Sequence, residues 1–352
     1  MDFVYLFGVI FLSSFFTIWA IPFVIKIAKK KNIIDEPGNR KSHNHPIPTA
    51  GGIAIFISFV SVLYFIDIKY PILEYKSIQL ALLFILFTGL KDDVLISSPL
   101  SKLLMQFIAF FILIYFSDLR ITSLHGIFGI NELPYWASFI ITVFLVFAII
   151  NSFNLIDGVD GLATGIATVI SISFGAWFMC LKSYNYALIS FSIATSAASF
   201  FYFNVFSKKK KIFMGDTGSM ILGSILAILV IKFSEISLLV PATLRISSIG
   251  IVFGLMAIPL LDSVKVFFIR LKQNRSPFRP DKTHLHHDLL TLGLSHFKVS
   301  MIIVAVNILI ILVVSVFHFL SNIALIGIVL LIGILFFLIV YALKRKQHAH
   351  IQ

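Results

Sequence analysis

Four groups of acidic, amide and histidine side chains interrupt an otherwise apolar sequence. A carboxylate beside a membrane span is costly to desolvate, so such groups are candidates for chemistry. The first group is the adjacent pair Asp92-Asp93. Neighbouring side chains on a helix point about 100° apart, so these two carboxylates need not share one ligand. They could hold a cation, position Lys102 or accept a proton, and a solvated turn is the competing interpretation.

The second group follows a long apolar run. Its members recur at a spacing of three and are Asn151, Asn154, Asp157 and Asp160. If this stretch stays helical or tightens to a 3₁₀ helix, the four side chains form one stripe. Gly158 and Gly161 indicate that the helix then unwinds, which lets the backbone approach a ligand. Mixed amide and carboxylate oxygens suit a hard cation such as Mg²⁺, whereas a simple capping turn does not need four periodic polar residues.

The third group surrounds Asp216, in the segment Phe213-Met-Gly-Asp-Thr-Gly-Ser219 that directly follows four lysines. Asp216 is placed to cap the N-terminus of the next helix. The free amides of a helix N-terminus also favour phosphate, and the glycines let a ligand approach. Capping and ligand binding are compatible here.

The fourth group is a histidine segment in the longest stretch between apolar runs, and it contains His284, His286 and His287. Zinc is disfavoured because the spacing is tight and no cysteine lies nearby. The basic residues around the histidines are Arg270, Lys272, Arg275, Arg279 and Lys282. This combination predicts contacts with phosphate or sugar.

The composition indicates what kind of protein must position these groups. Of the 352 residues, 59% are hydrophobic and 12% are charged, against roughly 45–50% apolar and about 25% charged in soluble domains. This excludes an ordinary soluble enzyme, a disordered chain and a nucleic-acid-binding module. It predicts an all-α polytopic integral membrane protein, with residues 1–352 as one transmembrane domain. The single cysteine, Cys180, excludes an intrachain disulfide.

Eleven apolar runs are candidates for membrane-spanning helices, although the third and fourth are short. They cover residues 3–25, 51–68, 78–90, 103–117, 135–150, 162–181, 186–206, 218–235, 245–269, 299–320 and 322–343. The first run lacks the basic segment and cleavage site of a signal peptide, so we expect it to be retained. Glycines and alternating apolar residues predict a short hairpin within residues 118–134.

The basic residues predict the orientation. Segments on one side hold 21 of the 28 lysines and arginines, and segments on the other side hold 6. By the positive-inside rule, the N-terminus lies outside and the C-terminus is cytoplasmic. The predicted cytoplasmic segments are residues 26–50, 91–102, 151–161, 207–217 and 270–298 and the tail from Lys344. All four chemical groups therefore share the cytoplasmic face, and the net charge of +12 could attract anionic lipids or an anionic substrate.

Together, these motifs resemble the polyprenyl-phosphate N-acetylhexosamine-1-phosphate transferases, the WecA/TagO/MraY group, over nearly the whole chain. The resemblance rests on four motifs in the family order: Asp92-Asp93, Asn151…Asn154…Asp157-Gly-Val-Asp160-Gly161, Phe213-Met-Gly-Asp216 and His284-Leu-His286-His287. The loop from Ser276 to His287 is similar to the WecA/TagO branch. Lys282 stands where that branch often has arginine, which keeps the charge but not the bidentate geometry.

The resemblance implies a function at the bacterial inner membrane, with the active site on its cytoplasmic face. A UDP-N-acetylhexosamine, with UDP-GlcNAc as the default, would give its sugar 1-phosphate to undecaprenyl phosphate and release UMP. This is the first membrane step in the synthesis of a cell-surface polysaccharide, such as lipopolysaccharide or a cell-wall polymer. The resemblance also implies dependence on Mg²⁺, with Mn²⁺ as the alternative ion, and a homodimer.

The same resemblance implies roles for individual residues. Asn154 and Asp216 would be the metal ligands, and Asp92, Asp93 and Asp157 the catalytic carboxylates. Phe213 would stack on uracil and Asp160 would hydrogen-bond beside it. The residues expected to bind pyrophosphate and sugar are Lys102, Arg275, Arg279, Lys282, His284, His286 and His287.

Both substrates are anions, and two unit charges 4 Å apart repel by roughly 4 kcal/mol at an effective dielectric constant of 20. Mg²⁺ and the basic residues would offset that repulsion. A phosphate monoester is largely dianionic at neutral pH, so direct attack on the β-phosphate is preferred, with Asp92 or Asp93 assisting. A covalent aspartyl intermediate is the alternative. We expect the lipid to enter through a groove that opens sideways near Asp92.

Two other functions remain open. A transporter also carries intramembrane carboxylates and broken helices, but here the charges gather at one face and no inverted repeat is visible. Within the enzyme class, a related UDP-N-acetyl sugar could replace UDP-GlcNAc.

Overall fold

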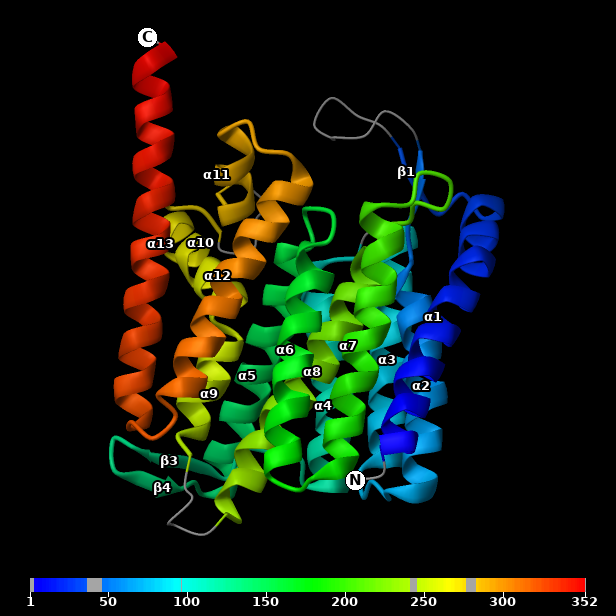
Figure 1. Cartoon of the computed structure of the whole chain (residues 1–352), viewed down its shortest axis with the longest axis vertical. Coiled ribbons are helices and arrows are strands. Elements are labelled where there is room, and N and C mark those ends of the chain that lie inside the picture. The colour runs from blue at the N-terminus through cyan, green and yellow to red at the C-terminus, as the bar shows by residue number, and fades with distance from the viewer. Residues whose placement is uncertain (1–2, 37–45, 96, 241–245, 277–282, 352) are drawn as a thin grey trace.

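Each of the eleven predicted spans coincides with a helix in the computed structural model, or with a pair of helices at the ninth (Figure 1). The structure describes residues 3–36, 46–95, 97–240, 246–276 and 283–351. The helices are α1 (Phe3–Lys30), α2 (Gly52–Lys69), α3 (Tyr75–Leu95), α4 (Pro99–Ser117), α5 (Tyr135–Ile156), α6 (Leu162–Cys180), α7 (Tyr184–Val205), α8 (Gly215–Leu238), α9 (Ser248–Leu255), α10 (Ala257–Lys272), α11 (Leu285–Thr291), α12 (His296–Val316) and α13 (Asn322–Ile351). The strands are β1 (Ile34–Asp35), β2 (Ile47–Pro48), β3 (Ser123–Ile127) and β4 (Ile130–Glu132).

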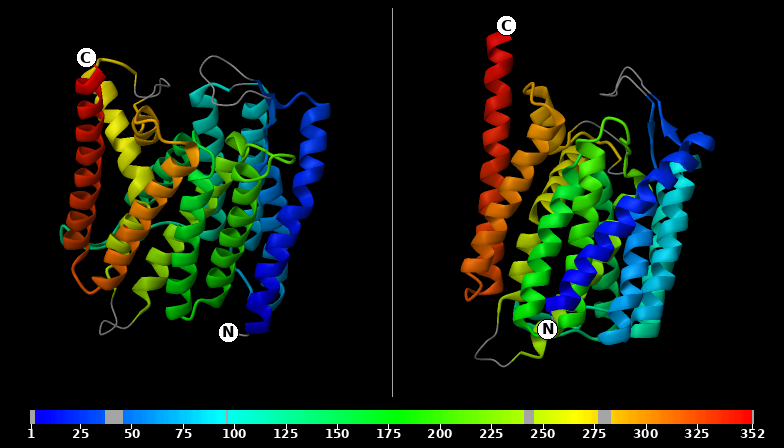
Figure 2. Two further views of the ribbon diagram at one scale, coloured as in Figure 1. Left: turned by 45° about the horizontal axis from the view of Figure 1, so that its top comes forward. Right: turned by 45° about the vertical axis from the view of Figure 1, so that its right-hand side comes forward.

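The chain is a mostly helical, multi-pass membrane protein. In the described ranges, nine helices are long and apolar enough to cross a membrane, and the bent pair α9–α10 would make ten. α3 is not among the nine, although it packs against both α4 and α8. The N-terminal and C-terminal ends lie at opposite ends of the bundle in every view (Figures 1 and 2).

α8 is the central helix. Within its apolar window 78% of the residues are buried, against 22% for α13, and α1 and α13 form opposite flanks of the bundle (Figures 1 and 2). Glycines let its neighbours approach: a Cβ on Gly218 would lie 2.9 Å from the Cα of Gly52, and a Cβ on Gly223 would lie 2.8 Å from the Cα of Ile150. Small residues commonly make such contacts between membrane helices. They bring the first turns of α8 against the start of α2 and the end of α5.

The ninth predicted span, residues 245–269, is broken rather than continuous. α9 and α10 meet at Met256 with a bend of 72°. Pro259 accounts for the break, because it has no N–H to donate to the carbonyl of Leu255 four residues earlier. Asn307 of α12 donates its side-chain amide to that carbonyl instead (3.4 Å).

Short strand pairs mark the two ends of the bundle. β3 and β4 confirm the hairpin predicted within residues 118–134, and they lie at the end that holds the N-terminus (Figure 1). β1 pairs with β2 at the opposite end, where α11 and the C-terminus also lie (Figure 1). There Phe213 donates its N–H to the carbonyl of Pro48 (2.9 Å) and accepts from the N–H of Gly51 (3.0 Å). This contact fixes the segment that leads into α8.

Two predicted loops are shorter than expected. α3 continues to Leu95, so Asp92 and Asp93 belong to the last turns of a helix and not to a loop over residues 91–102. α5 continues to Ile156, which shortens the loop predicted over residues 151–161. Helix hydrogen bonding therefore fixes the backbone on which these side chains stand.

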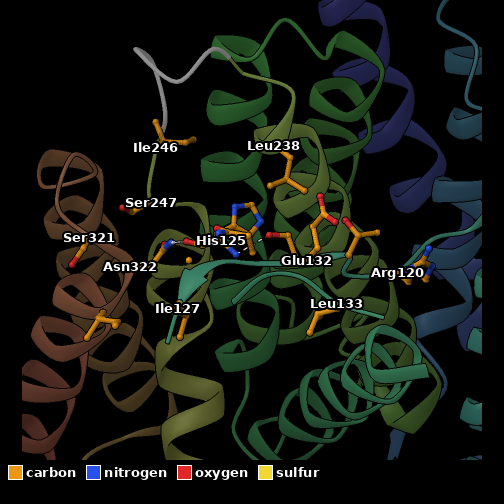
Figure 3. Close-up of a pocket in the computed structure, with 15 residues that line it drawn as sticks. Arg120, His125, Ile127, Glu132, Leu133, Leu238, Ile246, Ser247, Ser321 and Asn322 are labelled. Carbon is orange, nitrogen blue, oxygen red and sulfur yellow. Dashed lines mark hydrogen bonds between the residues drawn. The ribbon is translucent and has the colours of Figure 1, made fainter. Parts of the chain in front are cut away.

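A cavity of about 770 Å³ lies beside the β3–β4 hairpin (Figure 3). Its wall includes Arg120, Thr122, His125, Glu132, Leu238, Ser247 and Asn322. The described residues that line it include none of the predicted site residues. The cavity belongs to the N-terminal end of the bundle and is therefore separate from the acidic and amide groups.

Candidate active site

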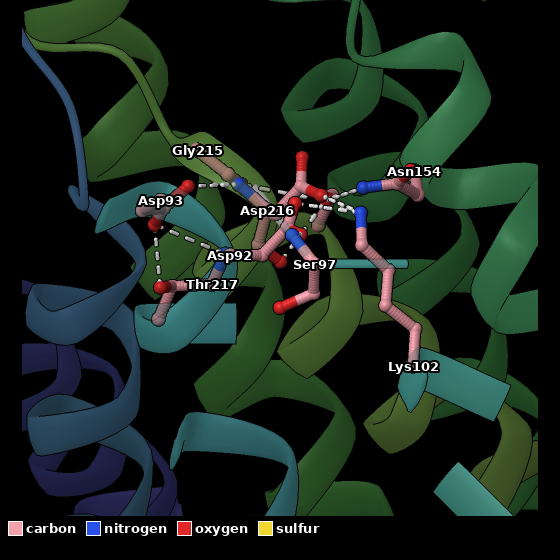
Figure 4. Close-up of polar contacts among 9 residues, drawn as sticks. Asp92, Asp93, Ser97, Lys102, Asn154, Gly215, Asp216 and Thr217 are labelled. Atoms are coloured by element: carbon pink, nitrogen blue, oxygen red, sulfur yellow. Dashed lines mark hydrogen bonds and ion pairs between the residues drawn. The ribbon is translucent and has the colours of Figure 1, made fainter. Parts of the chain in front are cut away.

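Lys102 joins two of the acidic groups. Its Nζ lies 2.6 Å from Oδ2 of Asp92 and 2.5 Å from Oδ2 of Asp216 (Figure 4). Lys102 stands in the first turn of α4, Asp92 in the last turns of α3 and Asp216 in the first turn of α8. The backbone N–H of Ser97 also donates to Asp92 (2.6 Å). One ammonium therefore ties three helices together and offsets part of the charge of two carboxylates.

Asp93 has a different task from its neighbour. Its carboxylate accepts the backbone N–H groups of Asp216 (2.7 Å) and Thr217 (3.3 Å) and the hydroxyl of Thr217 (2.6 Å). These N–H groups lack partners within α8, so Asp93 caps that helix from α3. Gly89 permits the close approach, because a Cβ there would lie 2.4 Å from the Cα of Thr217. The prediction that Asp216 caps α8 is wrong, since no side chain of its own segment does so.

Asn154 lies across from the first turn of α8. Its Nδ2 donates to Oγ of Ser219 (3.0 Å), which follows Asp216 by three residues. The amide oxygen of Asn154 and the carboxylate of Asp216 are therefore candidate metal ligands from two facing helices (Figure 4). Among the described residues no group of three His, Cys, Asp or Glu side chains is arranged as a metal site. Two protein oxygens still suit Mg²⁺, which takes its other ligands from water and substrate phosphates.

Asp157 is the acid of this cluster whose carboxylate accepts no hydrogen bond among the described residues. It directly follows α5. Burial raises the pKa of Asp157 well above its usual value, and the nearby carboxylates of Asp216 and Asp93 raise it further. A proton or a cation close to Asp157 would relieve that repulsion.

Asp160 faces a different partner. Its Oδ2 lies 2.7 Å from Nζ of Lys211, and that ammonium stands 5.6 Å from the centre of the Phe213 ring. Asn204 joins the two segments, because it accepts the N–H of Gly161 (2.6 Å) and donates to the carbonyl before Phe213 (3.0 Å). Asp160 and Phe213, both predicted to meet the uracil ring, are thus brought into one neighbourhood.

Residues 151–160 do not stay helical to their end, so the condition for a single polar stripe is not met. α5 ends at Ile156 and the chain turns, with φ of +78° at Gly161. Asn151 donates to the side chain of Gln106 on α4 (3.3 Å), whereas Asn154 faces α8. The unwinding expected from the two glycines is confirmed, and it is what sends these side chains to different partners.

The histidine segment forms the start of a short helix and reaches the acidic cluster. The rings of His284 and His286 are stacked at 5.6 Å, and those of His286 and His287 lie 4.3 Å apart. A Cβ on Gly158 would lie 2.7 Å from Nε2 of His286, so this ring packs directly on the turn that carries Asp157. Burial, aided by His287, lowers the pKa of His286 to about 3, which keeps the ring neutral at physiological pH.

One predicted substrate-binding residue is not brought to the cluster. Arg275 is exposed beyond the end of α10, and none of its described side-chain contacts reaches the acids. Arg279 and Lys282 lie outside the described residues.

The sequence reasoning missed four residues that shape this site. Thr217 and Ser219 lie inside a predicted motif without an assigned role, and Lys211 was treated only as part of a lysine run. The fourth, Asp262, stands inside an apolar span, which is itself a sign of function. Its buried carboxylate lies 2.8 Å from Nδ1 of His284.

Comparison with known proteins gives an independent result. The model of glycosyl transferase family 4 matches residues 75–234. The chain is 30% identical over 284 residues to the undecaprenyl-phosphate alpha-N-acetylglucosaminyl 1-phosphate transferase of Escherichia coli O157:H7, covering 79% of this chain and 74% of that relative. It is 33% identical over 300 residues to a probable undecaprenyl-phosphate N-acetylglucosaminyl 1-phosphate transferase of Bacillus subtilis, covering 84% and 80% respectively. The undecaprenyl-phosphate alpha-N-acetylglucosaminyl 1-phosphate transferase of Yersinia pestis is 30% identical over 279 residues. The match covers 76% of this chain and 72% of that relative.

These relatives are matched over most of both chains, and the family model covers α3 to α8, the helices that carry most of the acidic cluster. The chain therefore belongs to glycosyl transferase family 4, the family of the polyprenyl-phosphate N-acetylhexosamine-1-phosphate transferases.

Proposed function

We propose that the chain transfers N-acetylglucosamine 1-phosphate from UDP-GlcNAc to undecaprenyl phosphate and releases UMP. The observation that carries this proposal is that Lys102 and Asp93 gather the ends of α3, α4 and α8 into one acidic cluster, to which α5 adds Asn154 and Asp157. The printed names of the relatives supply the lipid and the sugar. The reaction is the first membrane step of a surface-polysaccharide pathway.

Asn154 and Asp216 would hold a magnesium ion. Both present oxygen atoms. Burial raises the pKa of Asp157 and the neighbouring carboxylates raise it further, and a divalent cation would balance the negative charge of those neighbours. When bound, the ion would neutralise the pyrophosphate and the charge that develops on departing UMP. Mn²⁺ is the alternative ion, because it also prefers oxygen ligands.

The reaction needs little covalent help from the protein. An oxygen of the lipid phosphate attacks the β-phosphorus of the nucleotide sugar. The bond from that phosphorus to the bridging oxygen breaks, and UMP leaves with this oxygen. Asp157 accepts the proton of a lipid phosphate that binds as a monoanion. Asp92 orients Lys102 toward the pyrophosphate, while Asp93 holds the first turn of α8 in place.

The sugar nucleotide and the lipid enter from different directions. Asp160 and Phe213 would contact uracil, and His284, His286 and His287 would contact pyrophosphate and sugar, with Arg275, Arg279 and Lys282 as further basic groups. The lipid would approach from the bilayer through a groove near Asp92. A related UDP-N-acetyl sugar is the alternative donor.

We further propose eleven spans, in which α3 and the bent pair α9–α10 each count as one. An odd number agrees with termini at opposite ends of the bundle (Figure 1). The distribution of lysine and arginine supports an outer N-terminus, a cytoplasmic C-terminus and an active site on the cytoplasmic face of the bacterial inner membrane. The family resemblance adds a homodimer, which cross-linking in native membranes would test.

The test is an assay of the purified protein in detergent with undecaprenyl phosphate and several UDP-sugars. Release of UMP and formation of the lipid pyrophosphate sugar are expected with UDP-GlcNAc and Mg²⁺, and both should stop when EDTA removes the metal. Asp216→Ala should abolish transfer. Asp118→Asn is the matched control, because Asp118 is an exposed carboxylate that pairs with Arg120 after α4, far from Asp216. Transfer by Asp216→Ala at the wild-type rate would remove Asp216 from the site.

A second experiment separates direct attack from the covalent route. The protein is incubated with UDP-GlcNAc that is labelled in the sugar, without lipid, and then denatured. Direct attack predicts no label on the protein. Bound label that moves to undecaprenyl phosphate on its addition would establish the covalent aspartyl intermediate instead.

A further inference from the structure

Asp262 is a buried carboxylate that the proposed reaction does not use. It lies in α10, two turns after the bend at Met256, and its side chain is only 2% exposed. Its Oδ2 lies 2.8 Å from Nδ1 of His284, and its Oδ1 accepts the backbone N–H of Leu285 (2.8 Å). A buried carboxylate is retained only where it is well paired. Here each oxygen bonds the histidine segment, and Nζ of Lys265 lies 3.7 Å from Oδ1.

These two bonds fix the start of α11. His284 directly precedes the helix with an extended backbone (ψ of 151°), and its own side chain provides no cap. Asp262 satisfies the N–H of Leu285, the first residue of α11, from a different helix. α11 has only seven residues, too few to be stable without tertiary contacts. Its place is therefore set by its partners.

Asp262 also decides which nitrogen of His284 carries hydrogen. A carboxylate only accepts, so Nδ1 of His284 must be the protonated nitrogen at this contact. Nε2 of His284 is then the nitrogen that remains for a ligand. Orientation of a histidine through its second nitrogen is the usual way in which proteins fix the tautomer of a functional histidine.

His284 is connected to the acidic cluster through His286. The rings of His284 and His286 stack almost in parallel, with an angle of 7° between their planes. His286 in turn rests on Gly158, beside Asp157. Asp262 is thus connected to the acidic cluster through two stacked rings and one glycine contact.

A second carboxylate, Asp288, also anchors α11, and it shares Lys265 with Asp262. Lys265 of α10 lies 3.1 Å from Asp288 of α11, and Lys344 of α13 lies 2.8 Å from the same carboxylate. α10, α11 and α13 accordingly gather near the C-terminal end of the bundle (Figures 1 and 2). Asp288 therefore offers a matched control, because it is a carboxylate that holds the same short helix without contacting a histidine.

We propose that Asp262 is a positioning residue for the transfer reaction: it fixes the orientation and the Nδ1–H tautomer of His284 and thereby the placement of the stacked histidines against the acidic cluster. This inference rests on the proposed function only for its kinetic consequences.

Asp262→Asn tests the inference with almost no change in volume. His284 and the N–H of Leu285 meet different oxygens of Asp262, and asparagine replaces one of these oxygens with an NH₂ group that only donates. We expect it to keep the bond to Leu285 and to donate its NH₂ to Nδ1 of His284, so that the hydrogen moves to Nε2. Turnover should fall by about 10–100-fold, as is typical when the partner that orients a functional histidine is lost.

The tautomer is measured directly, without any assay of transfer. In full-length protein labelled with ¹⁵N-histidine, the signal of His284 is identified by its loss in His284→Gln. Wild type should show the Nδ1–H form, and Asp262→Asn should show the Nε2–H form. An unchanged tautomer in Asp262→Asn, or an Nε2–H form in wild type, would overturn the inference even if the protein proved to be a different enzyme.

A double-mutant cycle separates positioning from simple destabilisation. If Asp262 acts through His284, Asp262→Asn should reduce kcat little further in a His284→Gln background. Asp288→Asn should retain transfer within about threefold, because this partly buried carboxylate pairs with Lys265 and Lys344 and not with His284. Additive losses from Asp262→Asn and His284→Gln, with wild-type transfer confirmed, would refute the positioning role and leave the proposed function standing.

Discussion

Gly158→Ala tests whether the histidine segment belongs to the active site. Gly158 lies in the turn between α5 and α6, and its Cβ position is 2.7 Å from Nε2 of His286. The added methyl group is small and the backbone at Gly158 does not require a positive φ. The substitution therefore changes one contact, the one that joins the two halves of the proposed site.

The size of the effect follows from that distance. Ordinary van der Waals contact begins at 3.4 Å, so the ring of His286 must retreat by about 0.7 Å. This approaches the misplacement of about 1 Å that can cost a functional group on the order of 10²-fold in rate. His286 cannot swing away cheaply, because it is 2% exposed and lies against both neighbouring histidine rings. Overpacking of this kind also destabilises proteins by about 1–3 kcal/mol. We expect kcat to fall by on the order of 10²-fold while the protein remains folded at the assay temperature.

The assay is transfer of labelled GlcNAc 1-phosphate to undecaprenyl phosphate, alongside thermal unfolding in the same detergent. Gly8→Ala is the control, because nothing lies within 4 Å of a Cβ at Gly8. In a helix interior this change should be neutral or stabilising by up to about 1 kcal/mol, with full activity. Gly158→Ala with wild-type kcat and an unchanged melting temperature would refute the contact between the histidine segment and the turn that carries Asp157.

Three further predictions address the remaining acids. Asp93→Ala should lower the free energy of unfolding by about 0.5–2 kcal/mol, the usual value of a helix cap, in thermal melts, and should reduce transfer as well. Burial and neighbouring carboxylates raise the folded-state pKa of Asp157 above its ordinary value of 3.8, so metal-free protein should lose stability as pH rises from that value through the raised pKa. Asp157→Asn should remove this loss and melt at a higher temperature than wild type at about pH 8 without metal, and a lower melting temperature would contradict the argument. Lys211→Met removes the ion pair of Asp160. It should raise KM for UDP-GlcNAc by up to about fivefold, or about 1 kcal/mol. Lys209→Met, in the same lysine run, should leave KM unchanged.

Membrane helices were predictable because they depend on local composition. A run of about 20 apolar residues forms a helix in a bilayer whatever its neighbours are, and the run that became α8 is an example. The break between α9 and α10 was harder to predict. Pro259 is visible in the sequence, but the bend also needs Asn307, 52 residues away from Leu255, to satisfy the freed carbonyl.

The sequence predicted which residues form the acidic cluster, but not which partner each of them contacts. Asp92 and Asp93 are adjacent, and the sequence offered no reason to separate them. Their side chains diverge on the helix, so Asp92 meets Lys102 of α4 while Asp93 meets the first N–H groups of α8. Such roles depend on which helix packs on which face, and that is decided by contacts such as Gly89 against Thr217.

The charge balance of the cluster supports the proposed metal ion from a different direction. Asp92 and Asp216 share the ammonium of Lys102, and Asp157 has no cationic partner among the described residues. A phosphate at about 4 Å from an uncompensated carboxylate would be repelled by roughly 4 kcal/mol at an effective dielectric constant of 20. The proposed cation would offset that repulsion where the two phosphorylated substrates meet beside Lys102. The surplus of carboxylates over cationic partners among the described residues at this end of the bundle therefore supports the proposal of a divalent cation.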